Sequence, residues 1–117
     1  MTRRILIADD EAGIRLVLAT HLRRRGWHVD EAVDGTEALD RLEHEEYDAV
    51  VLDHRMPGLT GIEVARTTNC EPLTFIFSAY VDRDLETEAT ELGCASVAKT
   101  DMEELLRQLD EVLGATT

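Results

Sequence analysis

Several features that would assign a chain to a particular class are missing from this sequence. Its apolar runs are short, and none approaches the length needed to cross a lipid bilayer. The apolar run near the start is broken by Asp9 and Asp10, so we do not expect a secretion signal. The two cysteines, Cys70 and Cys94, are isolated and form no metal-binding pair. We therefore expect free, buried thiols, a cytoplasmic protein and no membrane insertion.

Basic side chains are also scarce. The 117 residues contain 12 lysines and arginines against 25 aspartates and glutamates, which gives a formal net charge of −13. This charge opposes nonspecific binding to nucleic acid and to anionic membranes, so we expect no nucleic-acid partner. The three arginines at 23–25 are interpreted as the basic end of a helix, and a nucleic-acid patch is the less favoured alternative.

Length and composition fit one globular domain with one core. The chain is 44% hydrophobic and 32% charged, which is typical of folded proteins. It contains no internal repeat, low-complexity segment or linker. We expect a single domain over residues 1–117 with its core at about 3–113, and no output domain.

Short apolar runs alternate with helical patterns along the chain. Strands are predicted at residues 4–9, 27–32, 48–53, 73–78 and 95–99. Helices are predicted between them and after the last one, including a short helix from 59 or 60 to about 67, and a polar helix at 82–92. A loop is predicted at residues 69–72. The first and last helices have apolar side chains at helical spacing, namely Ile14, Val17, Leu18 and Leu22, and Met102, Leu105, Leu106, Leu109, Val112 and Leu113.

This alternation predicts a doubly wound α/β fold, in which five parallel strands form a sheet with helices on both faces. Ligands of such sheets bind beyond the carboxyl ends of the strands. Four of the predicted strands end in polar side chains. These are Asp9-Asp10-Glu11, Asp53, Ser78 and Lys99, the only lysine in the chain. Parallel strands would bring all of them to one edge of the sheet.

This set of side chains suits a divalent cation and a phosphoryl group. Clustered carboxylates without neighbouring His or Cys ligands favour a hard ion such as Mg²⁺. Neighbours on a strand point in opposite directions, so either Asp9 or Asp10 is expected to act through water. Asp53 is then the candidate nucleophile, which would form an aspartyl phosphate. Lys99 would bind a phosphoryl oxygen, and Ser78 could donate a hydrogen bond to another.

Each of these residues also has an ordinary structural interpretation. An aspartate after a strand is commonly a turn former or a helix cap, and for Asp10 or Asp34 alone that interpretation is at least as good. A lone lysine is usually a solvated surface residue. The collection of these groups at one edge favours a site. His54 follows Asp53 directly and should point the other way, so it is interpreted as exposed rather than as a general base.

Taken together, these segments resemble the receiver domain of two-component response regulators along nearly the whole chain. The most specific matching segment is Asp53–Glu63. The other matching segments are residues 5–11, residues 34–39, Ser78-Ala79 and Lys99. The resemblance implies a flavodoxin-like strand order of 2-1-3-4-5. It also implies that Asp53 accepts a phosphoryl group from the histidine of a sensor kinase or phosphotransfer protein.

The resemblance implies roles for other residues as well. Asp9, Asp10, Asp53 and the backbone carbonyl of Arg55 would arrange Mg²⁺. Ser78 and Lys99 would contact the phosphoryl oxygens, and Ser78 would shift toward them and reposition the fourth-helix face. The side chains of Arg55 and Tyr80 occupy positions at which the family tunes the lifetime of the acyl phosphate.

Two positions depart from the family pattern. The family usually has an aromatic residue three positions before the lysine, where this chain has Ser96, and a proline after it, where this chain has Thr100. Phosphorylation should survive both changes, whereas the usual hydroxyl–aromatic switch should not work in its common form. Tyr80 is a candidate to take over part of that role.

We therefore expect a phosphorylation-controlled signalling module rather than an enzyme. It would dock to a downstream protein through the face of the fourth helix, fifth strand and fifth helix, or pass the phosphoryl group onward. A homodimer and a longer natural chain stay open. One alternative is a constitutive interaction domain with a receiver fold. Another is a Mg²⁺-dependent phosphohydrolase that uses Asp53, for which a chain this short offers neither a substrate pocket nor a lid.

Overall fold

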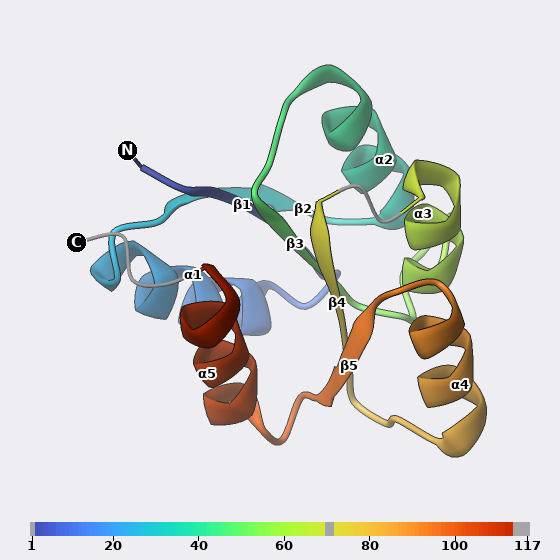
Figure 1. Ribbon diagram of the computed structural model, residues 1–117. Helices are drawn as coiled ribbons and strands as arrows, with labels where there is room; N and C mark the ends of the chain where they lie inside the picture. Colours follow the sequence, from blue (N-terminus) through green and yellow to red (C-terminus); the bar gives the residue numbers. More distant parts are fainter. Residues whose placement is uncertain (1, 70–71, 114–117) are drawn as a thin grey trace.

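Strands and helices alternate through the computed structural model, which describes residues 2–69 and 72–113 (Figure 1). The strands are β1 (Arg4–Ala8), β2 (His28–Ala32), β3 (Ala49–Leu52), β4 (Leu73–Ser78) and β5 (Ala95–Ala98). The helices are α1 (Ala12–Arg24), α2 (Gly35–His44), α3 (Gly61–Thr68), α4 (Arg83–Glu91) and α5 (Met102–Leu113). Each predicted strand and helix is present, and most of the predicted ends lie within a residue of the observed ones.

The strands form one parallel sheet in the order β2-β1-β3-β4-β5, which confirms the expected strand order. β1 and β3 lie at the centre, and both are buried along almost their whole length because helices cover both faces of the sheet. The pairing of Ala8 with Leu52 and of Ser78 with Ala98 brings the carboxyl ends of these strands to one edge.

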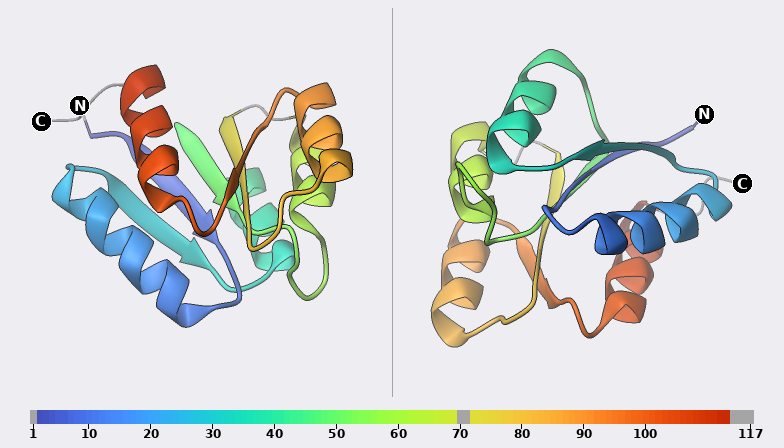
Figure 2. Two further views of the ribbon diagram at one scale, coloured as in Figure 1. Left: turned by 90° about the horizontal axis from the view of Figure 1, so that it is seen from below. Right: turned by 180° about the vertical axis from the view of Figure 1, so that it is seen from behind.

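The helices form a layer on each side of the sheet. α1 and α5 lie on one face, and α2, α3 and α4 lie on the other (Figures 1 and 2). Successive side chains of a strand point to opposite faces, so Ile7 belongs to one core cluster and Leu6 to the other. The sheet is therefore held in place by two separate apolar layers.

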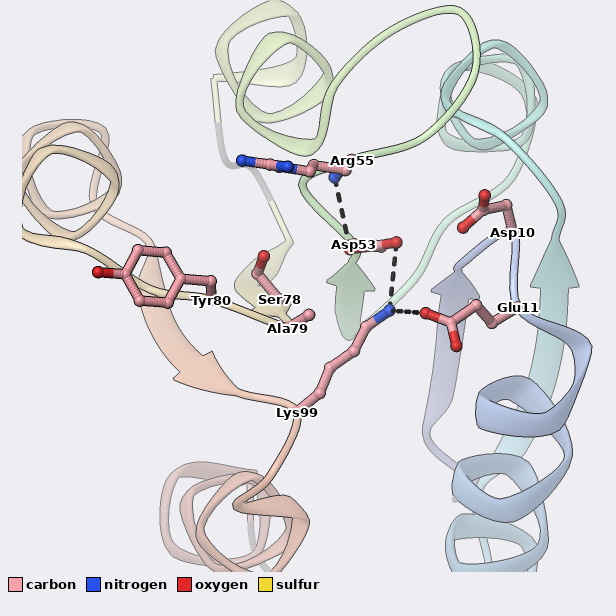
Figure 3. A pocket seen from close by; sticks show the side chains of 8 residues that line it. All are labelled: Asp10, Glu11, Asp53, Arg55, Ser78, Ala79, Tyr80 and Lys99. Carbon is pink, nitrogen blue, oxygen red and sulfur yellow. Dashed lines mark hydrogen bonds and ion pairs between the residues drawn. The ribbon is translucent and has the colours of Figure 1, made fainter.

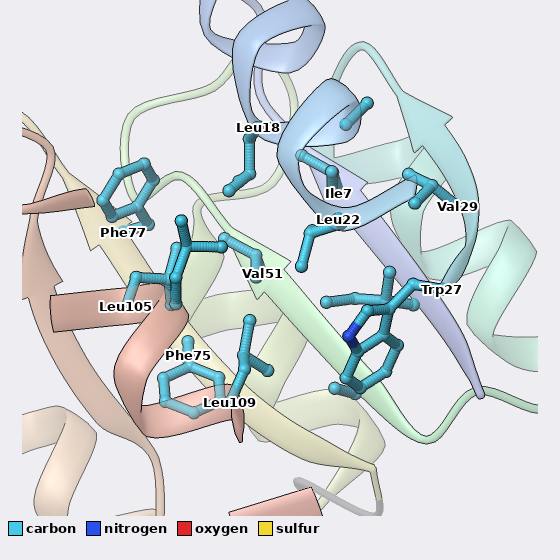
Figure 4. Close-up of a cluster of buried hydrophobic side chains, with 14 of the residues drawn as sticks. Ile7, Leu18, Leu22, Trp27, Val29, Val51, Phe75, Phe77, Leu105 and Leu109 are labelled. Carbon is cyan, nitrogen blue, oxygen red and sulfur yellow. The ribbon is translucent and has the colours of Figure 1, made fainter. Parts of the chain in front are cut away.

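The layer under α1 and α5 is the larger of the two clusters. Val51 and Phe75 of the sheet lie among Leu18 of α1 and Leu105 and Leu109 of α5 (Figure 4). These side chains are 1% exposed or less, so each contributes about 1.5–3 kcal/mol of transfer free energy to the folded state. The stripe predicted on the last helix is thus confirmed for its described positions. The side chains of Val112 and Leu113 lie outside the described part of the chain.

One predicted core position is wrong. Val17 was expected on the apolar face of the first helix, but it is 46% exposed, and α1 buries Leu18, Ala19 and Leu22 instead. Successive side chains of an α-helix are rotated by about 100° around its axis. When Leu18 and Leu22 face the sheet, Val17 therefore lies at the edge of the buried face.

Two further expectations concern single features. Cys94 is buried, as predicted, whereas residues 70 and 71 of the predicted loop at 69–72, Cys70 among them, lie outside the described residues. None of the described helices has the length and apolar composition required to cross a membrane.

Candidate functional site

The polar residues that follow the strands are fixed by an extension of the backbone ladder. The N–H of Asp53 donates to the carbonyl of Ala8 at 2.8 Å, and the N–H of Lys99 donates to the carbonyl of Ser78 at 2.7 Å. The N–H of Asp9 donates to the last carbonyl of β2 at 3.1 Å. Asp9, Asp53 and Lys99 therefore stand level at the carboxyl edge of the sheet, where the sequence predicted them.

Lys99 lies at the centre of the site. Its Nζ is 2.8 Å from Oδ2 of Asp9. It is also 3.2 Å from Oδ2 of Asp53 and 3.0 Å from Oε1 of Glu11, two contacts that Figure 3 shows. The side chains of Lys99, Asp9 and Asp53 are 8%, 3% and 5% exposed, so three charges are removed from water together. Burial lowers the pKa of Lys99, but the hydrogen bonds to Asp9 and Glu11 outweigh it and raise that pKa above its ordinary value. Lys99 is therefore a permanent cation.

The buried carboxyl group of Asp53 has an altered proton affinity. Burial, and next the charge of Asp9, raise its pKa to about 6, although Lys99 acts in the opposite direction. The N–H of Arg55 also donates weakly to Oδ1 of Asp53, at 3.4 Å. Asp53 is therefore a carboxylate at neutral pH. An added cation, or loss of its charge, stabilises it more than it would stabilise an ordinary solvated carboxylate.

Asp10 completes an acidic cluster. One carboxylate oxygen from each of Asp9, Asp10 and Asp53 lies within 4.8 Å of the others, and Asp10 is exposed whereas the other two are buried. In Figure 3 the Asp10 side chain points toward Asp53. Three carboxylates without a nitrogen or sulfur ligand among them fit a hard divalent cation. The cluster that the sequence predicted as a Mg²⁺ site is therefore assembled.

A cavity of about 470 Å³ opens beside this cluster. Ser78, which is 3% exposed, and Lys99 both lie in its wall next to Asp53. Tyr80 is 72% exposed, and the Arg55 side chain extends away from the acidic cluster (Figure 3). The cavity is lined by Asp10, Glu11, Asp53, Arg55, Ser78, Ala79, Tyr80 and Lys99. A tetrahedral oxyanion placed here would meet an ammonium group and a hydroxyl group at the side of a carboxylate.

Two positions singled out in the sequence lie elsewhere. Ser96 is half-buried on β5, opposite Ile76, and is not among the residues that line the cavity. His54 is half-buried rather than exposed, which corrects the expectation for this residue, and its buried Nδ1 has no hydrogen-bond partner in the structure. It lines a smaller hollow beside α4 together with Tyr80. The side chain after Asp53 points away from the cluster because successive residues alternate, and it lies beside Leu85 and Glu88 of α4 in this hollow.

Glu11 is the residue that the sequence analysis did not assign. It was grouped with Asp9 and Asp10 as an acidic strand end, but no role followed from its position. The structure places its carboxylate on Lys99, which lies 88 positions further along the chain. The only signal was its proximity to Asp9 and Asp10 in sequence.

Comparison with known proteins assigns the chain to a family. Residues 5–110 match the family model of the response regulator receiver domain. The chain is 35% identical over 96 residues to sporulation initiation phosphotransferase F of Bacillus subtilis, covering 80% of this chain and 77% of the relative. It is 40% identical over 86 residues to the alkaline phosphatase synthesis transcriptional regulatory protein PhoP of the same organism. That match covers 74% of this chain but only 36% of PhoP.

Solved structures agree with this assignment. The response regulator protein TrrA from Thermotoga maritima, solved in complex with Mg²⁺-BeF, superimposes with a TM-score of 0.82 at 31% identity. The superposition covers 94% of this chain and 98% of that one. The fold, the matched residues and the acidic cluster lead to one conclusion. The chain belongs to the receiver domains of two-component response regulators.

Proposed function

We propose that this chain receives a phosphoryl group on Asp53 and uses it to control a protein-binding surface. The observation that carries the proposal is the environment of Asp53, a buried carboxylate that lies 3.2 Å from a cation and beside an acidic cluster. The donor is the phosphohistidine of a sensor kinase or phosphotransfer protein. A carboxylate oxygen of Asp53 attacks the phosphorus atom and an O–P bond forms. The P–N bond breaks, and its electron pair leaves with the imidazole.

The acidic cluster supports Mg²⁺ as the cofactor. Both oxygens of Asp9 are engaged, because Oδ2 contacts Lys99 at 2.8 Å and Oδ1 accepts the N–H of Glu11 at 2.9 Å. The contacts of Asp53 are longer, at 3.2 Å to Lys99 and 3.4 Å to the N–H of Arg55, and Asp10 is exposed. Asp10, Asp53 and the backbone carbonyl of Arg55 would therefore hold the ion directly, and Asp9 would act through water. When bound, Mg²⁺ neutralises charge on the transferring group. TrrA in complex with Mg²⁺-BeF is the solved relative that supports this assignment.

Lys99 and Ser78 hold the transferred group. The ammonium of Lys99 lies on one side of Asp53, and the hydroxyl of Ser78 faces the same cavity (Figure 3). Both groups are hydrogen-bond donors that can contact phosphoryl oxygens. Arg55 and Tyr80, at the outer part of the cavity, limit the access of water and so set the lifetime of the acyl phosphate.

The output surface is formed by α4, β5 and α5. α4 is attached through only two buried residues, Leu85 and Ala89, and its other described side chains are polar and mostly exposed. A helix with so small an apolar contact area can shift at low cost when Ser78 moves at the end of β4. The downstream protein binds this surface in its shifted form.

Intact-mass measurement tests the phosphoryl transfer. Purified protein with Mg²⁺ and phosphoramidate should gain one phosphoryl group, and Asp53→Asn should gain none. Chelation of Mg²⁺ should slow the gain, whereas Asp40→Asn, at an exposed position on α2, should leave it unchanged. Equal labelling of wild type and Asp53→Asn would refute the assignment.

A constitutive interaction domain is the second candidate, and Ser96 favours it. β5 carries no aromatic side chain at the position where the family usually has one, so phosphorylation could leave the output surface unchanged. The two candidates differ in a binding experiment with a captured downstream protein. Control by phosphorylation predicts an affinity that changes with phosphoramidate, whereas the constitutive domain predicts the same affinity in both states.

A further inference from the structure

Glu11 has a side chain that the fold of its own segment does not use. It occupies the N-cap position of α1, but its side chain makes no capping hydrogen bond. Its carboxylate instead accepts a hydrogen bond from Nζ of Lys99 at 3.0 Å, across the cavity that contains Asp53. In Figure 3, Glu11 lies on the opposite side of the Lys99 ammonium from Ser78. The contact therefore belongs to the site and not to the cap of the helix.

Lys99 has no donor to spare while this contact exists. An ammonium group has three N–H donors, and Lys99 already has three carboxylates within 3.2 Å. While a phosphodonor approaches, Asp53 is still a carboxylate, so Lys99 can bind an incoming phosphoryl oxygen only if one of these three partners is released. Binding of the incoming phosphoryl group to Lys99 therefore requires that Asp9, Asp53 or Glu11 release the ammonium group.

Burial decides which partner leaves. The side chains of Asp9 and Asp53 are 3% and 5% exposed, and before the O–P bond forms an unpaired carboxylate at either position would be costly. The side chain of Glu11 is 60% exposed, so water replaces the ammonium there at little cost. Glu11 is the partner that can be exchanged.

We propose that Glu11 is a positioning residue that holds Lys99 while Asp53 is unmodified and yields it to the phosphoryl group. The inference rests on the proposed function. Because Glu11 competes with the phosphoryl oxygens for the same ammonium, it slows phosphoryl uptake. A half-exposed ion pair of this kind should slow it by about two- to fivefold.

Three variants distinguish the effect of the length of the Glu11 side chain from the effect of its charge. Glu11→Asp keeps the charge but is one methylene too short to contact Lys99, and Glu11→Gln keeps the length but loses the charge. Glu43→Gln, at an exposed position on α2 that does not line the cavity, is the matched control for the change in net charge. With phosphoramidate and saturating Mg²⁺, both Glu11 variants should be phosphorylated about two- to fivefold faster than wild type. Glu43→Gln should not differ, and a Glu11→Asp rate equal to that of wild type would overturn the proposal.

A second measurement does not depend on phosphoryl transfer. Lys99 is the only lysine, so protein labelled with ¹⁵N-lysine has one side-chain ammonium signal. Its hydrogens should exchange with water faster in both Glu11 variants than in wild type or Glu43→Gln. Faster exchange with unchanged phosphorylation rates would overturn the competition while the proposed function stands. Absence of phosphorylation in every protein, wild type included, would overturn the proposed function and this inference together.

Discussion

The ionised side chain of Asp53 lowers the stability of the folded protein, and the same environment makes it reactive. This side chain is 5% exposed, and its carboxylate lies next to a second buried carboxylate, Asp9. Lys99 offsets part of the repulsion, yet the pKa of Asp53 still rises from 3.8 to about 6. The ionised group is thus less stable in the folded chain than in water, which favours any reaction or ligand that removes its charge.

This cost predicts that Asp53→Asn stabilises the protein in the absence of Mg²⁺. Because the pKa in the folded state lies above that of the unfolded state, protonation stabilises the fold. The contribution is complete below about pH 3.8 and is lost as pH rises through about 6. A rise of this size corresponds to about 3 kcal/mol as an upper value, and lost contacts with Lys99 reduce the net gain to about 1–3 kcal/mol.

Urea unfolding of both proteins at about pH 4 and about pH 7.5, below and above the transition near pH 6, measures the difference. The free energy of unfolding of Asp53→Asn should exceed that of wild type at the higher pH, and the gain should disappear at the lower one. A variant that is less stable than wild type at both values would contradict the account of Asp53.

Most of the site residues could be predicted from the sequence because they follow strands directly. Parallel pairing sets the level of Asp53 and Lys99 through backbone hydrogen bonds, whatever the side chains are. Glu11 and His54 could not be assigned in this way. The contact of Glu11 depends on the path of the Lys99 side chain across the sheet edge, and the burial of His54 depends on how α3 and α4 pack.

At the scale of elements, the start of α3 links the fold to the site. Thr60 caps this helix through a capping box with Glu63. Gly61 follows, and its Cα lies against the backbone of the Asp53 segment. A Cβ at this position would lie 2.6 Å from the carbonyl oxygen of Asp53, so only glycine fits without a backbone shift.

Gly61→Ala should therefore disturb the loop that follows Asp53. We expect a loss of about 1–3 kcal/mol in the free energy of unfolding, because a backbone carbonyl must move. The rate of phosphorylation by phosphoramidate should also fall. Gly13→Ala is the matched control, because a Cβ there meets nothing within 4 Å. Near the start of α1 it should leave stability unchanged or raise it by up to about 1 kcal/mol. Equal stability of the two variants would rule out the close approach of Gly61.

Helix type and order were predictable from spacing, but the exact buried face was less so. The last helix has a regular apolar stripe, and its described apolar positions are buried or half-buried as expected. α1 carries apolar residues around more of its circumference, including Leu16 and Val17, which are 66% and 46% exposed. Spacing alone cannot choose between overlapping faces, because the choice depends on how α1 is oriented on the sheet.

At the scale of the whole molecule, negative charge is concentrated as well as abundant. The chain of 117 residues has a formal net charge of −13. Three of its 25 acidic side chains, Asp9, Asp10 and Asp53, meet at one edge of the sheet. Self-repulsion of this kind lowers the stability of the folded chain relative to the expanded one. A divalent cation at the cluster would relieve the repulsion locally, and it would bind the folded state alone because the unfolded chain does not assemble the three carboxylates.

Mg²⁺ should therefore raise the stability of the whole protein in a saturable way. At a free concentration of about 100 times its dissociation constant, a ligand specific to the folded state adds about 2.7 kcal/mol. Thermal unfolding at increasing Mg²⁺, at constant ionic strength, measures this gain. Asp10→Asn should remove most of it, since Asp10 is exposed and makes no ion pair with Lys99, so its loss leaves the buried pairs intact. Asp40→Asn, with the same change in net charge at an exposed position on α2, should respond to Mg²⁺ like wild type. If both variants keep the full gain, the stabilisation comes from general screening of the negative surface, and the acidic cluster does not bind the ion.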